Sequence, residues 1–118
     1  MNMAPQLKVS SVGDITQVEF VDKHILDDTN IQRISEELIT VVDEVPTPRV
    51  LISFANVEHL SSAALGALIN INNRVKGKDG QLRLCAIDPQ IHEVFRITKL
   101  DQIFQILPDH DTALASFG

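Results

Sequence analysis

Apolar and polar residues alternate in some stretches of the chain and recur every three or four positions in others, which predicts strands interleaved with helices. Alternation over residues 7–12 and again over 15–21, on either side of Gly13-Asp14, predicts an antiparallel hairpin closed by a tight turn. Residues 49–54 are almost continuously apolar, as in a strand covered on both faces. Two later strands are predicted at residues 81–86 and 103–107.

Two long helices are predicted between these strands. The first has an apolar stripe at spacings of three and four, after the candidate caps Asp27, Asp28 and Thr29, and it ends at Pro46. The stripe consists of Ile31, Ile34, Leu38, Val41, Val42 and Val45. The second runs from Ser61-Ser62 to about Lys76, with a row of Ala64, Leu68, Ile71 and Val75.

Two short helices complete the pattern. Asp88-Pro89 and Pro108-Asp109 each read as the start of a helix. The apolar faces expected for these helices are Ile91, Val94, Phe95 and Ile97 in the first, and Ala113, Leu114 and Phe117 in the second.

The order of elements predicts the fold class. A hairpin followed by alternating helices and strands is typical of an α/β protein whose sheet is mostly parallel with one antiparallel strand. We expect four to five strands and about four helices. The 118 residues suit a single domain with one core.

Composition narrows the function. Sixteen acidic residues against ten basic ones give a net charge of -6, which argues against a general nucleic-acid binder and against an anionic membrane surface as the target. The N-terminus has no signal-peptide pattern, and no apolar run has the length of a transmembrane helix. The single cysteine, Cys85, allows no intrachain disulfide, so we expect a cytoplasmic protein.

Few residues suggest catalysis or metal binding. The four histidines, His24, His59, His92 and His110, are scattered without ligand-like spacing, and no phosphate loop or Gly-x-Ser-x-Gly elbow occurs. Cys85 lies within a predicted strand, so we expect a buried, unreactive thiol. Asp27-Asp28 could hold magnesium, but helix capping explains the pair more simply. We expect a binding module without a cofactor rather than an enzyme.

The stretch from Val57 to Gly66 is the most informative part of the chain. Ser61 and Ser62 stand where a loop after an apolar strand becomes a helix. A hydroxyl there can cap the helix, and an added phosphate would be favoured by the positive end of the helix. The position alone leaves both roles open.

This stretch resembles the serine loop of STAS domains, the fold of bacterial anti-sigma factor antagonists. In that family a loop of the type Asp-Ser-(Ser/Ala/Thr)-Gly-Leu-Gly opens the second helix. Ser62 falls on the family's phosphorylated serine, and Leu65-Gly66 falls on its Leu-Gly pair. Leu26-Asp27 matches a second marker before the first helix. The resemblance extends over about residues 7–117.

The resemblance implies a function. Ser62 would be phosphorylated by a kinase that is also the anti-sigma factor, an ATPase of the histidine-kinase-like type, and a PP2C-type phosphatase would be a further partner. The implied partner-binding residues are Asp27, Ser61, Ala63, Ala64, Leu65 and Gly66. Unmodified protein would bind the anti-sigma factor, and phosphorylation would release it. The protein would be a monomer or weak dimer.

Two departures from the family pattern leave alternatives open. Ser61 replaces the family's Asp, and Ala64 replaces a Gly. Under a one-residue shift Ser61 becomes the phosphorylated residue. Alternatively, the domain is not phosphorylated and binds a protein partner or a small anionic ligand.

Overall fold

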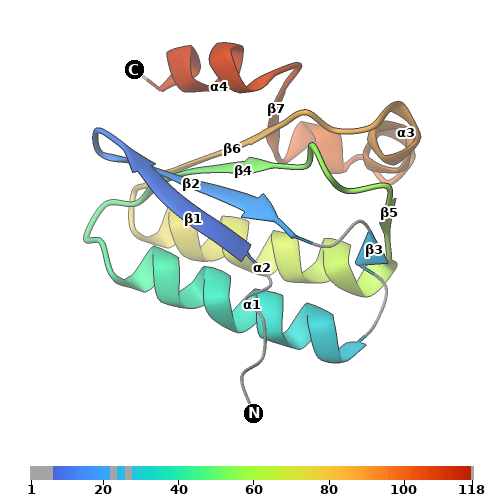
Figure 1. Cartoon of the computed structure of the whole chain (residues 1–118), viewed down its shortest axis with the longest axis horizontal. Helices are drawn as coiled ribbons and strands as arrows, with labels where there is room; N and C mark the ends of the chain where they lie inside the picture. The colour runs from blue at the N-terminus through green and yellow to red at the C-terminus, as the bar shows by residue number, and fades with distance from the viewer. Residues whose placement is uncertain (1–6, 22–23, 26–27, 118) are drawn as a thin grey trace.

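The computed structural model describes residues 7–21, 24–25 and 28–117, and of residues 24–25 and 28–30 it describes the backbone alone. A five-stranded sheet lies between a pair of long helices and one short helix (Figure 1). The strand order is β1-β2-β4-β6-β7. The strands are β1 (Leu7–Val12), β2 (Ile15–Phe20), β4 (Arg49–Ser53), β6 (Gln81–Cys85) and β7 (Gln105–Leu107).

The pairing of these strands confirms the predicted α/β fold with a mostly parallel sheet. β1 and β2 form the antiparallel hairpin, with Val9 opposite Val18, and Gly13 in the turn has a φ of +60°. The other neighbours, β2 with β4, β4 with β6 and β6 with β7, are parallel. Each of these parallel connections contains at least one helix, as is usual for the crossover between parallel strands.

Two helices cover one face of the sheet (Figure 1). α1 (Asp28–Asp43) and α2 (Ser62–Gly77) bury most of the predicted apolar rows against β2, β4 and β6. The first helix was predicted to run to Pro46 but ends at Asp43, so Val45 lies beyond it, because a residue before a proline disfavours the helical conformation. The ends of the two helices are joined by a two-pronged ion pair, in which Arg74 Nε and Nη2 donate to the carboxylate of Asp43 at 3.1 and 3.0 Å. This ion pair holds the pKa of Asp43 below its usual value.

The opposite face is covered in part by α4 (His110–Ser116). Leu51, Cys85, Ala113 and Phe117 form a second, smaller apolar cluster there. Cys85 is fully buried, as predicted, and burial raises the pKa of its thiol. The thiol is therefore protonated near neutral pH and poorly reactive.

Several predicted boundaries were wrong by one or two residues. The strand predicted at 81–86 ends at Cys85 because Ala86 takes a left-handed φ of 57°. The strand predicted at 103–107 begins only at Gln105, because the 3-10 helix η1 (Leu100–Gln102) precedes it and Ile103 N donates to Leu100 O. The strands predicted to end at residues 21 and 54 end at Phe20 and Ser53.

The predicted apolar face of α3 (Pro89–Ile97) was too wide. Ile91 and Phe95 are buried, but Val94 is 39% exposed and Ile97 is 69% exposed. α3 lies at the end of the sheet where β4 and β6 finish, so only one narrow side of the helix meets the core (Figure 1).

A pair of two-residue strands was missed by the sequence pattern. β3 (His24–Ile25) and β5 (His59–Leu60) pair in parallel, with Ile25 opposite Leu60. This pairing joins the segment before α1 to the segment before α2. The two long helices therefore start side by side at one end of the molecule (Figure 1).

The core contains a row of phenylalanine rings, and Phe95 is at its centre. The ring of Phe95 meets Phe54 at 6.5 Å and Phe104 at 5.8 Å between centroids, both edge to face. We expect Phe95→Ala to lower the free energy of unfolding by about 3–5 kcal/mol, because it leaves a cavity among rigid neighbours. Chemical denaturation measures this loss.

Ile97→Ala on the same helix is the matched control. Its side chain is mostly exposed, so the expected change is within about 0.5 kcal/mol. Equal losses for the two variants would contradict the described placement of α3.

Candidate functional site

Ser61 ends the loop before α2 and caps the helix. Its backbone is extended, with φ −82° and ψ 164°, and its Oγ accepts a hydrogen bond from Ala64 N at 3.2 Å. Its carbonyl oxygen accepts from Leu65 N at 3.1 Å. Ser61 is half-buried, and its hydroxyl stabilises the first turn of α2.

Ser62 is the first residue of α2 and faces solvent. Its hydroxyl makes no hydrogen bond to any of the described residues. Two adjacent serines therefore differ in environment: one hydroxyl is part of the fold, and the other is accessible. The sequence predicted the position of this pair but left the assignment of roles open.

The start of α2 is electrostatically suited to a negative group. The helix has 16 residues, none of its first-turn residues is acidic, and Arg74 and Lys76 occupy its last turn. The first backbone N–H groups of a helix have no partner within it, and the helix dipole adds partial positive charge there. A dianionic group on Ser62 would meet this field without a nearby carboxylate on the same turn.

The predicted partner-binding residues on α2 include two that are exposed and two that are buried. Ala63 and Gly66 are exposed beside Ser62, and a Cβ added at Gly66 would meet nothing within 4 Å. These small residues give the first turns of α2 a flat surface. Ala64 and Leu65 are 5% and 6% exposed, so they support this surface from within the core.

Asp27, the remaining predicted site residue, lies outside the described residues. On either side of it, Ile25 pairs with Leu60 and α1 begins at Asp28. The backbone before α1 therefore lies beside Leu60, the residue that precedes Ser61. The sequence pattern alone did not show this.

A shallow depression of about 160 Å³ adjoins the segment before the serine pair. Glu58, His59 and Leu60 form one side of it, and α3 contributes Gln90, Ile91 and Val94. The sequence pattern gave no sign of this depression, because it depends on the exposed side of α3. The exposed Val94 adds apolar area beside the serine loop.

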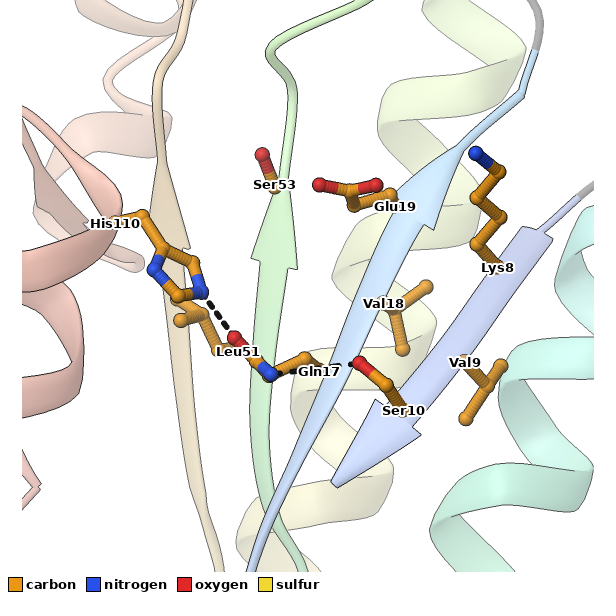
Figure 2. A pocket seen from close by; sticks show the side chains of 9 residues that line it. All are labelled: Lys8, Val9, Ser10, Gln17, Val18, Glu19, Leu51, Ser53 and His110. Atoms are coloured by element: carbon orange, nitrogen blue, oxygen red, sulfur yellow. Dashed lines mark hydrogen bonds between the residues drawn. The ribbon is translucent and has the colours of Figure 1, made fainter. Parts of the chain in front are cut away.

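A separate groove of about 350 Å³ lies on the other face of the sheet, between the hairpin and α4 (Figure 2). Three of its polar side chains bond to one another, and Ser53 bonds to the backbone. Gln17 Nε2 donates to Ser10 Oγ at 3.4 Å, Gln17 Oε1 bonds to the ring of His110, and Ser53 Oγ accepts from Ala55 N at 3.4 Å. This groove is on different elements from the serine pair.

The described residues contain no group of three or more His, Cys, Asp or Glu side chains placed to hold a metal ion. His59, His92 and His110 lie on β5, α3 and α4. Within the same described ranges, no helix combines the length and the apolar character needed to cross a membrane.

Comparison with known proteins places the chain in a family. BtrV of Bordetella bronchiseptica, whose name assigns it provisionally to the anti-sigma factor antagonists, is 27% identical over 93 residues, which cover 79% of each chain. An anti-sigma-factor antagonist (STAS) domain protein from Planctomyces limnophilus superposes with a TM-score of 0.87 at 22% identity, over 98% of this chain and 100% of that one.

The phosphorylated form of SpoIIAA, a Bacillus cell fate determinant, shares the fold with a TM-score of 0.69 at 14% identity, over 92% of this chain and 96% of that one. The family model described as STAS domain matches residues 12–113, which include every strand of the main sheet in whole or in part and the whole of the serine loop. The chain therefore belongs to the STAS domain family.

Proposed function

We propose that this protein is an anti-sigma factor antagonist that binds an anti-sigma factor while Ser62 is unmodified and is released when Ser62 is phosphorylated. The names of its relatives support the first half of this proposal. The exposed, uncommitted hydroxyl of Ser62 at the start of α2 is the observation that carries the second half.

Phosphorylation at Ser62 is compatible with the fold of the free protein. A phosphate group on Ser62 adds a charge of about −1.5 to −2. The open N–H groups and the dipole of α2 favour an anion at this end of the helix. The solved structure of SpoIIAA in its phosphorylated form shows that this fold accommodates a phosphorylated state.

The negative charge of a phosphate on Ser62 would weaken the binding of a partner that covers this residue. A partner that covers Ser62 has to pack against Ala63 and Gly66, which are small and carry no charge. Burying a phosphate there would require its desolvation, and any acidic group opposite would repel it. A loss of about 3 kcal/mol would weaken binding more than a hundredfold.

The partner we propose is an anti-sigma factor with serine kinase activity of the histidine-kinase-like ATPase type, with a PP2C-type phosphatase reversing the reaction. The exposed contact surface would comprise Ser61, Ser62, Ala63 and Gly66, with Asp27 beside it. In this scheme the protein is a cytoplasmic binding module without catalytic activity, a monomer or weak dimer.

The second candidate is a STAS domain that works without phosphorylation and binds a partner or a small anionic ligand. The serine at position 61 favours it, because a kinase that recognises an acidic residue before its target finds none here.

The division of roles between the two serines gives a stability prediction. Ser61→Ala should lower the free energy of unfolding by about 1 kcal/mol, because Ala64 N loses its capping acceptor. Ser62→Ala should change it by less than about 0.5 kcal/mol, since the side chain makes no contact that the fold requires. Urea denaturation of the two variants distinguishes these outcomes, and the reverse order would assign the cap to Ser62.

The switch is tested by capturing partners with Ser62→Ala and Ser62→Asp as parallel baits. The alanine bait should retain a kinase-like ATPase, identified by mass spectrometry, and the aspartate bait should lose it. Incubation of the wild-type protein with that ATPase and ATP should then add one phosphate to Ser62.

Asn73→Asp is the matched control for added charge. Asn73 is exposed on α2, about 16 Å along the helix from Ser62 at 1.5 Å per residue. It should retain the partner. If the Ser62→Asp bait holds the ATPase as firmly as Ser62→Ala does, phosphorylation at this residue is not the control and the second candidate takes its place.

A further inference from the structure

The groove between the β1–β2 hairpin and α4 contains two opposite charges that do not pair with each other (Figure 2). We call it the hairpin groove, and its volume of about 350 Å³ is at the lower end of the range for small-molecule sites. The polar side chains that line it are Lys8, Ser10, Gln17, Glu19, Ser53 and His110.

The strand register places these side chains on one face of the sheet. Residues directly opposite each other on neighbouring strands share a face, and so do residues two apart along a strand. Lys8 is opposite Glu19, and Glu19 is opposite Ser53, which gives one row across β1, β2 and β4. The next row consists of Ser10, Gln17 and Leu51. Both rows therefore face the same space.

The second row and the floor of the groove are held by internal contacts. Gln17 bonds to Ser10 through Nε2 and to the ring of His110 through Oε1, so a chain of side chains runs from β1 to α4 (Figure 2). Leu51 is 1% exposed and Ser53 is 6% exposed. The shape of this part of the groove is thus fixed before any ligand arrives.

The first row carries the charges, and its two charged groups do not neutralise each other. Side chains directly opposite on antiparallel strands are close enough to form an ion pair. Here the Glu19 carboxylate is directed toward Ser53 of β4, while the Lys8 side chain extends toward the end of β2 (Figure 2). Neither charged group forms an ion pair or a hydrogen bond with the described residues.

The balance of charge in the groove indicates the class of ligand. Lys8 is the only Lys or Arg, and Glu19 the only Asp or Glu, among the described residues that line it. A purely anionic ligand would meet the Glu19 carboxylate beside Lys8, and a purely cationic one would meet the Lys8 ammonium beside Glu19. A ligand that carries both charges on neighbouring atoms satisfies the two side chains together.

We propose that the hairpin groove binds a small zwitterion of the α-amino acid type, with its ammonium group on Glu19 and its carboxylate on Lys8. The rest of the ligand would lie along the bonded row of Ser10 and Gln17, beside His110. The groove is on the face of the sheet opposite α1 and α2, so this site goes beyond the function proposed for Ser62 and is independent of it.

The test is titration of the ¹⁵N-labelled protein with L-glutamine and, separately, with L-leucine. We expect at least one of them to give saturable shifts of the backbone amide signals of β1 and β2. Saturation by L-glutamine alone would show that the groove selects a polar side chain, and saturation by L-leucine alone that it selects an apolar one. Saturation by neither would overturn the proposal.

Two analogues of the amino acid that binds show whether both charges are recognised. The N-acetyl derivative lacks the ammonium group, and the carboxamide derivative lacks the carboxylate. Each should bind at least about tenfold more weakly, the effect of losing one charge-assisted hydrogen bond. An analogue that binds as tightly as the parent amino acid would contradict the zwitterion and overturn the proposal.

Two variants locate the ligand. Lys8 and Glu19 are exposed, so the fold is expected to persist in Lys8→Gln and Glu19→Gln, and each should weaken binding of the amino acid about tenfold. Lys8→Gln should leave the affinity for the carboxamide derivative unchanged, because that derivative has no carboxylate for Lys8 to bind. Glu19→Gln should likewise leave the affinity for the N-acetyl derivative unchanged.

Lys76→Gln and Glu36→Gln are the matched controls. They remove the same charges from exposed positions on α2 and α1, on the other face of the sheet, and should leave the affinity unchanged. Equal losses in the groove variants and in these controls would show that binding does not occur in the hairpin groove. Binding of the amino acid should persist in Ser62→Ala, whose partner capture tests the separate role of Ser62.

Discussion

Strand β4 is buried on both faces, and the positions of the other elements follow from that burial. Val50, Leu51 and Ile52 are at most 1% exposed, with α1 and α2 on one side and the cluster around Phe117 on the other. A strand covered in this way fixes its register, because a slip of one residue would exchange its two faces. The chain leaves β4 at the carboxyl end of this central strand, and α2 has to begin close by.

The long elements were predictable because their patterns report burial directly. The rows on α1 and α2 and the run in β4 lie where periodicity placed them, except for Val45 and Phe54, which follow the ends of α1 and β4. The pairing of β3 with β5 was not predictable, because a strand of two residues has no periodic signal and this pairing depends on contact between two distant segments. Val94 and Ile97 are exposed for a related reason: a short helix at the end of a sheet buries only what lies opposite it.

The candidate site was also only partly predictable, because tertiary contacts decide what each of its residues does. The sequence located Ser61 and Ser62 at a helix start but could not say which hydroxyl accepts from Ala64 N, because that depends on the backbone angles of the loop. The sequence also did not show that Asn72 is buried and that its Nδ2 has no hydrogen-bond partner among the described residues, because both depend on how α2 packs in the fold. Residue identity shows which chemistry is available, and tertiary structure shows which group remains without a partner.

The division of labour between Ser61 and Ser62 has a consequence for how such a protein can evolve. A residue that both starts a helix and carries a regulatory group cannot change without affecting folding and signalling together. In the proposed scheme the two tasks lie on neighbouring residues with different surroundings, the cap on Ser61 and the regulatory group on Ser62. Substitutions at position 62 would then alter or silence a regulatory input in one lineage while the domain keeps its thermal tolerance and cellular abundance.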